Sequence, residues 1–273
     1  MCDNHQAGEA SWIRRLIMWV YGEYVGDTLD FYMFLARLGG APLIGGAVRF
    51  FAHQYGKYLH GGRAATVEEC MEILSRAGRI TVVDCACREK NNQCEKPRRT
   101  CLVINTGAGL FGKHQKQNYI SLEEAGEIIS NSYNYGLIRS ITHCMTPNLY
   151  AICNCCPCCC VPYRLRTEFG IRSAVENGNY SASIDTTKCK KCRECIKTCS
   201  EKAVNPDSGV VDTDKCLGCG LCLGSCRHGA LKMVERVNPT PVLTPGPVEK
   251  VLMYTAFFGI ILPLAAVFKL SRK

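Results

Sequence analysis

A helix followed by a strand is the first element pattern that the apolar positions predict, just ahead of Cys85. Residues 66–69, Thr-Val-Glu-Glu, have the composition of a capping box, in which two side chains satisfy exposed backbone amides. Apolar residues at helical spacing continue to Ala77, and a glycine that can end the helix follows. Residues 79–84 form a short apolar run, which is typical of a strand that ends at Cys85.

The same order of elements recurs further along the chain. Residues 121–124, Ser-Leu-Glu-Glu, form a second capping box, and the helix that they begin is predicted to run to Tyr135 before a glycine. A strand is predicted over residues 137–143, and it ends at Cys144. The two units together predict a Cys-rich α/β domain over residues 64–179, in which each strand delivers a cysteine at its end.

The N-terminal segment, residues 1–63, is predicted to be helical. Residues 11–60 are apolar and aromatic with scattered charges. The stretch 29–51 is long enough to cross a membrane, but Arg37 near its centre would cost about 2.5–3.5 kcal/mol in a bilayer. We therefore expect interfacial or partner-docking helices, and the core of an N-terminal helical subdomain is the alternative.

The C-terminal segment changes character twice. Residues 238–250 contain four prolines and are predicted to form a stiff linker. Residues 251–268 are apolar and uncharged, and at about 1.5 Å per residue a helix of that length covers about 27 Å. We therefore predict a transmembrane anchor over residues 251–268. A helix buried against another subunit is the alternative.

Cysteine is the unusual component, with 21 residues among 273. A chain with so many cysteines uses them either as a disulfide framework or as metal ligands. Residues 1–10 are polar and lack the apolar region of a secretory signal, so we expect reduced thiols that are available to metals.

The strongest internal repeat places two cysteine motifs in residues 180–237. Residues 184–192 align with residues 211–219 at an offset of 27 positions, and each copy opens a run with the spacing C-x2-C-x2-C-x3-C. Three thiolates of such a run reach three corners of one [4Fe-4S] cube, and the fourth reaches the neighbouring cube. The first predicted ligand set is Cys189, Cys192, Cys195 and Cys226, and the second is Cys216, Cys219, Cys222 and Cys199.

On these two motifs, residues 184–234 resemble the bacterial-type two-[4Fe-4S] ferredoxins. The resemblance implies a small β-hairpin and helix fold with pseudo-twofold symmetry, and one-electron transfer between two neighbouring clusters. The prolines that usually follow the fourth cysteine are replaced by Ser200 and Arg227. Basic residues beside the cysteines, such as Lys190 and Arg193, are expected to raise the cluster potentials, because positive charge favours the reduced state.

Most of the cysteines upstream of the ferredoxin-like segment are candidate ligands for at least one further iron-sulfur cluster. Adjacent cysteines point in different directions, so the dense run over residues 153–160 can serve two sites or hold one site from two sides. Zinc and redox-active dithiols are the alternatives. Cys2 and Cys70 have no near partner in the sequence and are expected to be ordinary thiols. The pool of candidate ligands is Cys85, Cys87, Cys94, Cys101, Cys144, Cys153, Cys155, Cys156, Cys158, Cys159 and Cys160.

This upstream segment resembles the Cys-rich modules that are fused ahead of ferredoxin domains in iron-sulfur proteins of anaerobes. The pair Cys155 and Cys156 is also similar to the double-cysteine motifs of heterodisulfide reductases, in which non-cubane clusters are catalytic. The full spacing of that family is absent. The resemblance implies that the upstream segment holds iron-sulfur chemistry of its own.

Taken together, these patterns predict an α+β protein with a two-cluster ferredoxin module, a Cys-rich α/β domain and a C-terminal transmembrane helix. The expected function is electron transfer in a membrane-associated anaerobic redox complex, with protein redox partners. An iron-sulfur reductase with a catalytic cluster and a redox-sensing regulator are the alternatives. The expected location is the cell membrane, with the iron-sulfur domains on the cytoplasmic side. The formal charge of +9 does not identify the partner, but the basic stretch 96–99 lacks interleaved aromatic residues, so no nucleic acid is expected.

Overall fold

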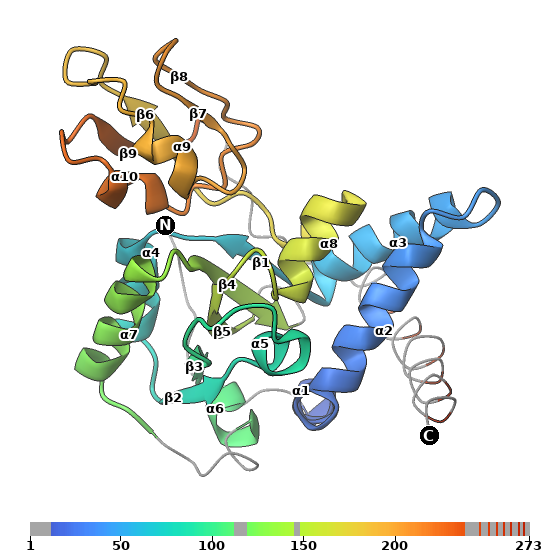
Figure 1. Ribbon diagram of the computed structural model, residues 1–273. Coiled ribbons are helices and arrows are strands. Elements are labelled where there is room, and N and C mark those ends of the chain that lie inside the picture. The colour runs from blue at the N-terminus through green and yellow to red at the C-terminus, as the bar shows by residue number, and fades with distance from the viewer. Residues whose placement is uncertain are drawn as a thin grey trace.

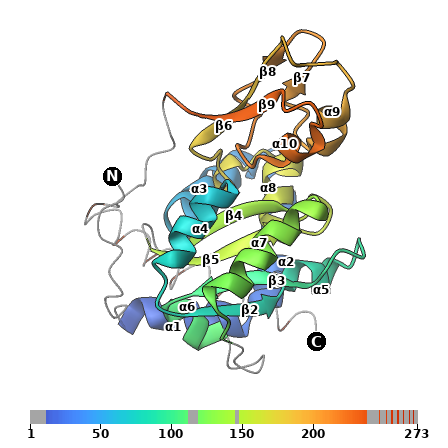
Figure 2. The ribbon, with the colours of Figure 1, turned by 90° about the vertical axis from the view of Figure 1, so that its left-hand side faces the viewer.

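The computed structural model describes residues 12–111, 119–144 and 148–237, together with isolated positions between 246 and 270. Figures 1 and 2 show two parts. A larger α+β domain contains the Cys-rich segment, and a smaller module that contains the two cysteine motifs lies at one end of it. The α+β class is therefore the one that the sequence predicts.

The larger domain is built on a five-stranded sheet in the order β1-β4-β5-β3-β2. Every neighbouring pair is antiparallel. It follows that β2 and β4 run in opposite directions, so their C-terminal residues lie at opposite ends of the sheet along the strand direction. The strands are β1 (His60–Ala64), β2 (Ile80–Asp84), β3 (Arg99–Ile104), β4 (Ile138–Cys144) and β5 (Leu149–Cys155).

Two helices, α4 (Val67–Ser75) and α7 (Leu122–Asn134), cover one face of this sheet. Each begins with the capping box that the sequence predicts, at Thr66 and Ser121, and each ends within two residues of its predicted end. Apolar side chains of both helices form one buried cluster with alternate residues of the strands, such as Leu102. Local capping and amphipathic spacing therefore account for this half of the domain.

The opposite face carries the remaining helices of the domain, including the three formed by the N-terminal segment. Ile17 and Met18 are buried against the sheet, and residues of α2 pack on α8. The turn ahead of α3 and its first half leave Leu43, Phe50 and Phe51 exposed. The helices are α1 (Trp12–Glu23), α2 (Val25–Leu38), α3 (Gly45–Tyr58), α5 (Ala86–Asn91), α6 (Thr106–Phe111) and α8 (Val161–Phe169), followed by the 3-10 helix η1 (Arg172–Ala174).

The smaller module repeats one unit. Its two short helices, α9 (Glu194–Thr198) and α10 (Leu221–Ser225), are separated by the same 27 positions as the cysteine motifs, since 221 minus 194 is 27. The first strand of the module pairs with the last in a two-stranded antiparallel sheet, and a hairpin lies between the two helices. The strands are β6 (Tyr180–Ile184), β7 (Val204–Asn205), β8 (Val210–Val211) and β9 (Leu231–Glu235).

The prediction of a transmembrane helix is corrected by the structure. Among the described residues, no helix has the length and apolar character that crossing a membrane requires. The longest of the helices, α2 and α3, have 14 residues each, or about 21 Å, against a bilayer core of about 30 Å. Most of the linker 238–250 and of the segment 251–268 lies outside the described residues. The predicted location at the cell membrane depended on this anchor and is withdrawn with it.

Candidate metal centres

The first three cysteines of the first motif and the last cysteine of the second motif line one cavity in the smaller module. Lys190, Arg193 and His228 also line it. The backbone amide of Ala230 donates a hydrogen bond to the Sγ of Cys226, at 3.3 Å. The four thiols that surround this cavity are those of Cys189, Cys192, Cys195 and Cys226.

A second cavity repeats the arrangement. The amide of Ala203 donates a hydrogen bond to the Sγ of Cys199, at 3.4 Å, in the position that Ala230 has in the first cavity. Burial raises the pKa of the Cys219 thiol to about 11, so a positively charged core is needed to hold its thiolate there. The four thiols around this cavity are those of Cys199, Cys216, Cys219 and Cys222.

Left-handed backbone turns bring each motif around its cavity. Arg193 and Gly220, at equivalent positions of the repeat, have φ angles of 64° and 73°, and each directly precedes a short helix. Gly218 has φ 80°, and a side chain there would meet the carbonyl oxygen of Tyr180 at 2.1 Å. Only glycine fits this close approach of two backbones. The strained turns therefore place the three closely spaced thiols of each motif on one side of a cavity.

The Cys-rich domain separates its thiols into two groups. The first group, which we call the tetrad, joins the loop after α5 to the turn between β5 and α8. All four Sγ atoms lie within 4.8 Å of one another. Two of the four side chains are buried and two are partly buried. The tetrad consists of Cys94, Cys156, Cys158 and Cys159.

The second group, which we call the six-thiol ring, forms a closed circuit of thiol-thiol contacts. Cys85 follows β2, Cys101 lies in β3, and Cys153 and Cys155 alternate along β5, so that all four meet near one edge of the sheet. Cys87 from the first turn of α5 and Cys160 from the N-cap of α8 complete the circuit. In order of contact, the six-thiol ring consists of Cys85, Cys87, Cys160, Cys155, Cys153 and Cys101.

The direction of the pKa shift alternates from one thiol to the next around the six-thiol ring. Hydrogen bonding to Cys101 and Cys87 lowers the pKa of Cys85 to about 2, and hydrogen bonding to Cys155 and Cys87 lowers that of Cys160 to about 6. Hydrogen bonding to Cys160 and Cys85 raises the pKa of Cys87 well above its usual value. Each thiolate is thus held by protonated neighbours. Full ionisation of this buried site requires a positively charged metal core.

A buried arginine lies between the two groups. The side chain of Arg88 is 1 % exposed, and its Nη1 donates a hydrogen bond to the carbonyl oxygen of Asn154 at 2.8 Å. Burial alone would lower the pKa of Arg88, but the thiols of Cys85 and Cys101, together with a hydrogen bond to Cys156, raise it. No carboxylate pairs with this guanidinium among the described residues. Thiolates at these positions would therefore compensate its buried charge.

Two cysteines of the larger domain, Cys144 and Cys70, belong to neither the tetrad nor the six-thiol ring. Cys144 belongs to the predicted pool, but β4 runs opposite to β2, so Cys144 at the end of β4 and Cys85 after β2 lie at opposite ends of the strands. Burial raises its pKa to about 12, with Arg14 acting in the opposite direction. Cys70 is buried in the apolar cluster under α4. Cys2 lies outside the described residues. Cys144 is therefore placed as a buried core thiol.

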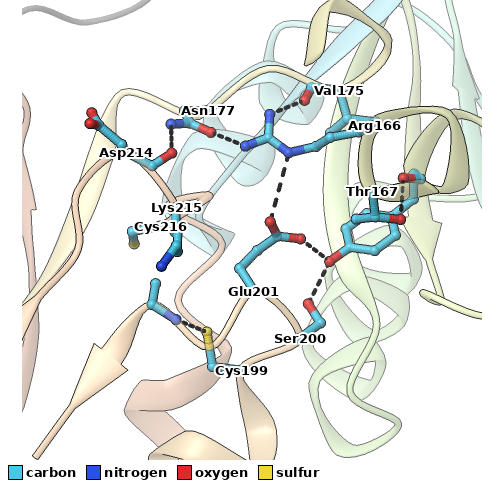
Figure 3. A network of polar contacts seen from close by, with 12 residues as sticks. Arg166, Thr167, Val175, Asn177, Cys199, Ser200, Glu201, Asp214, Lys215 and Cys216 are labelled. Carbon is cyan, nitrogen blue, oxygen red and sulfur yellow. Dashed lines mark hydrogen bonds and ion pairs between the residues drawn. The ribbon is translucent and has the colours of Figure 1, made fainter. Parts of the chain in front are cut away.

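Helix α8 connects the Cys-rich domain to the smaller module. Figure 3 shows the polar network, in which Arg166 contacts Glu201 at 3.9 Å and donates hydrogen bonds to Val175 and Asn177. The hydroxyls of Tyr163 and Ser200 are hydrogen-bonded at 2.7 Å. Beside this network, one apolar cluster contains Cys155 and Cys160 of the six-thiol ring together with Leu217, Leu221 and Cys219 of the second cavity. The six-thiol ring and the second cavity are therefore joined by continuous packing.

Sequence reasoning kept the upstream cysteines in one pool, with two sites as one option for the run 153–160, and it found neither Arg88 nor the thiols that form each group. A signal for the separation is present at Cys155 and Cys156, because neighbouring residues of an extended strand point to opposite sides. The pairing of β3 with both β2 and β5 carries no comparable signal in the sequence.

Comparison with known proteins gives one match. The family model of a 4Fe-4S binding domain matches residues 210–232, which include the second cysteine motif. Neither the curated proteins nor the solved structures provide a match to the chain. The chain therefore contains a ferredoxin-type segment that binds a 4Fe-4S cluster.

Proposed function

We propose that this chain is an electron-transfer protein with two [4Fe-4S] clusters in residues 180–237 and a further iron-sulfur cluster in the Cys-rich domain. The observation that carries the proposal is the pair of cavities, each lined by three thiols of one motif and one thiol of the other. A cubane cluster takes four thiolates and supplies one-electron oxidation and reduction. Cys189, Cys192, Cys195 and Cys226 would hold the first cluster, and Cys199, Cys216, Cys219 and Cys222 the second.

The chain's own groups support both clusters. Backbone amides donate hydrogen bonds to Cys199 and Cys226, the two ligands that would cross between the repeats. Hydrogen bonds to ligand sulfur stabilise the more negatively charged, reduced state and raise the potential. Lys190 and Arg193 line the first cavity, and the buried Arg139 lies beside Cys219 of the second, so we infer that positive charge raises the potential of both clusters.

The six-thiol ring is the proposed place of the further cluster. Its thiols come from strands and helix ends that are held by the sheet, and the charge of Arg88 compensates thiolates there. The apolar cluster around Leu217 and Leu221 places Cys155 and Cys160 against the second cavity. Arg139 of β4, which is buried, also donates a hydrogen bond to the carbonyl oxygen of Cys219. This packing supports electron exchange between the second cluster and the six-thiol ring.

Single electrons must come from one partner and go to another, so we further propose protein redox partners in a multi-subunit complex. The first cavity is open to such a partner, since Cys192 is exposed at its rim. The Cys-rich domain would exchange electrons with the other partner.

One observation favours an iron-sulfur reductase as the second candidate. The six-thiol ring offers more thiols than the four that a cubane takes. Tyr21, His60 and Tyr150 also pack beside it, with the His60 and Tyr21 ring centroids 3.9 Å apart and His60 Nε2 3.1 Å from the Tyr150 hydroxyl. These groups can hold or move a proton next to the metal site.

Iron and acid-labile sulfide, counted on the full chain after anaerobic purification, test the proposal. We expect more than eight irons and eight sulfides per chain, with about eight retained when Cys101 and Cys153 are both replaced by alanine. A total of eight in the unmodified chain would remove the further cluster, and fewer than eight would remove the two-cluster ferredoxin. A change in the EPR signal of the reduced protein on adding small thiols or disulfides, abolished by the same double replacement, would favour the reductase.

A further inference from the structure

The tetrad has the dimensions of a site for one metal ion. The Sγ of Cys94 lies 3.7 Å from that of Cys159 and 3.8 Å from that of Cys156, and the Sγ atoms of Cys158 and Cys159 are 3.8 Å apart. With a metal-sulfur bond of about 2.3 Å, the edge of a regular tetrahedron of four sulfurs is about 3.8 Å. The three distances therefore match the edges of a tetrahedral thiolate site.

The same distances do not suit a four-iron cube. In a cubane cluster the four cysteine sulfurs cap the outer corners, so the whole iron-sulfide core lies between them and keeps them further apart. The eight cysteines of the smaller module surround two cavities, as such cores require. In the described part of the chain, the tetrad is the one set of three or more such ligand atoms that all lie within 4.8 Å of one another.

The surroundings of the tetrad complete a closed site. The backbone amide of Gln93 donates a hydrogen bond to the Sγ of Cys159 at 3.3 Å, and the side-chain amide of Asn91 donates to the Cys159 carbonyl at 2.9 Å. Cys156 and Cys159 are buried against Leu137. The guanidinium of Arg88 contacts Cys156, so a positive charge lies beside the sulfurs. Four sulfur ligands with such outer contacts are typical of structural sites, which leave no open position on the metal.

We propose that the tetrad binds a single tetrahedral metal ion, zinc or iron(II), and not an iron-sulfur cluster. Binding forms four metal-sulfur bonds and releases the four thiol protons to solvent, with no change in oxidation state, so the site carries a net charge of about −2. The inference is independent of the electron-transfer proposal, because it involves none of the thiols that are assigned to clusters there.

The position of the tetrad gives the ion a structural role. Cys156, Cys158 and Cys159 lie between Cys155 and Cys160 in one short turn, and these two flanking thiols belong to the six-thiol ring. An ion that ties this turn to Cys94 fixes its backbone. The flanking thiols are then held toward the six-thiol ring, while the ion itself takes no part in electron transfer.

Metal and sulfide counts on the full chain test the proposal. We expect Cys94→Ser and Cys158→Ser, which alter the two partly buried ligands, each to lose one zinc or iron ion per chain with no loss of acid-labile sulfide. Cys70→Ala, which alters a buried thiol outside both groups, should keep every ion. Loss of about four irons with about four sulfides in the tetrad variants would overturn the proposal, and so would an unchanged metal count.

A measurement on the unmodified protein covers the case in which these variants do not fold. If the ion is zinc, X-ray absorption at the zinc edge should give four sulfur neighbours at about 2.3 Å and no iron neighbour. If the protein contains no zinc, the total iron must fall by one when cobalt(II) is supplied during growth, with one cobalt in four-sulfur coordination in its place. A protein with no zinc and no cobalt uptake would refute the single-ion site.

Discussion

The hydroxyls of Tyr163 and Ser200 share a hydrogen bond of 2.7 Å across the boundary between the Cys-rich domain and the smaller module. Tyr163 lies in the first turn of α8, three residues after Cys160 of the six-thiol ring. Ser200 directly follows Cys199, and Tyr163 also donates to the neighbouring Glu201. One side chain thus ties the six-thiol ring to the second cavity.

Replacement of Tyr163 by phenylalanine should loosen this boundary. The variant keeps the aromatic packing of Tyr163 but loses its hydrogen bonds to Ser200 and Glu201, so we expect the free energy of unfolding to fall by about 1–2 kcal/mol. Electron exchange between the two parts should also slow. Urea denaturation and rapid-reduction kinetics, both followed by cluster absorbance, measure the two effects. Tyr135→Phe, at an exposed position outside the boundary, is the control. Equal results for the two variants would show that the boundary does not depend on Tyr163.

Arg88 provides a second prediction, because thiolates at Cys85 and Cys101 would compensate its buried charge. Arg88→Met should destabilise the folded chain by about 3–5 kcal/mol, since ionised thiols would lose their compensating charge. Iron bound upstream of the ferredoxin-like segment should fall, while the eight irons proposed for the smaller module remain. Arg88→Lys keeps the charge and should retain more upstream metal than Arg88→Met.

The control for Arg88 is Arg76→Met. Arg76 forms an exposed ion pair with Glu72, at 2.7 Å, and such pairs contribute less than about 1 kcal/mol. If Arg88→Met retains all upstream metal, the thiols near it do not need the guanidinium, and the charge argument fails.

Local sequence signals predicted the parts of the fold that depend on neighbouring residues. The capping boxes at Thr66 and Ser121 identified both helices on one face of the sheet, because the contacts that begin a helix lie within four residues. Cysteine spacing likewise identified the ferredoxin-type segment that the 4Fe-4S family model matches. Hydropathy over residues 251–268 was the signal that misled, since apolar composition alone does not show where a segment packs.

The grouping of the upstream thiols could not be predicted because it depends on strand order. Cys85 and Cys144 look equivalent in the sequence, as each ends a strand after a capped helix. In the sheet, β3 lies between β2 and β5, which brings Cys101 to Cys85 and Cys153. The C-terminal end of β4, with Cys144, lies at the opposite end of the strands. Pairing between distant strands thus decides which thiols meet, and it leaves no periodic trace in the chain.

The crossing of ligands between the two motifs can be tested by combining replacements. If Cys226 and Cys192 hold the same cluster, Cys226→Ala should lose about four irons, and adding Cys192→Ala should lose no more. Combining Cys226→Ala with Cys219→Ala should instead lose about eight. Mössbauer spectra of iron-57-enriched protein count the clusters, and Cys144→Ala should leave the spectrum unchanged. If the first pair behaves additively and the second does not, the ligand assignment is reversed.

His60 should make the stability of the fold depend on pH. Burial, with a smaller contribution from His143, lowers its pKa from 6.5 to about 3. Between these values the unfolded chain binds a proton that the folded chain does not, so the free energy of unfolding falls as the pH falls. From pH 7 to pH 5, His60 should lower the free energy of unfolding by about 1–2 kcal/mol. Well above pH 6.5, where the unfolded chain also leaves His60 neutral, this loss is absent.

The variant His60→Phe tests this dependence. Phenylalanine keeps the contact with the Tyr21 ring but loses the hydrogen bond to the Tyr150 hydroxyl, so the variant should be less stable at pH 7. Its stability should nevertheless change less than that of the unmodified protein between pH 7 and pH 5. Anaerobic urea denaturation at both pH values gives the two slopes, and the acid sensitivity of the metal centres, common to both proteins, cancels in the difference. Parallel slopes would mean that His60 is protonated equally in the folded and unfolded chains.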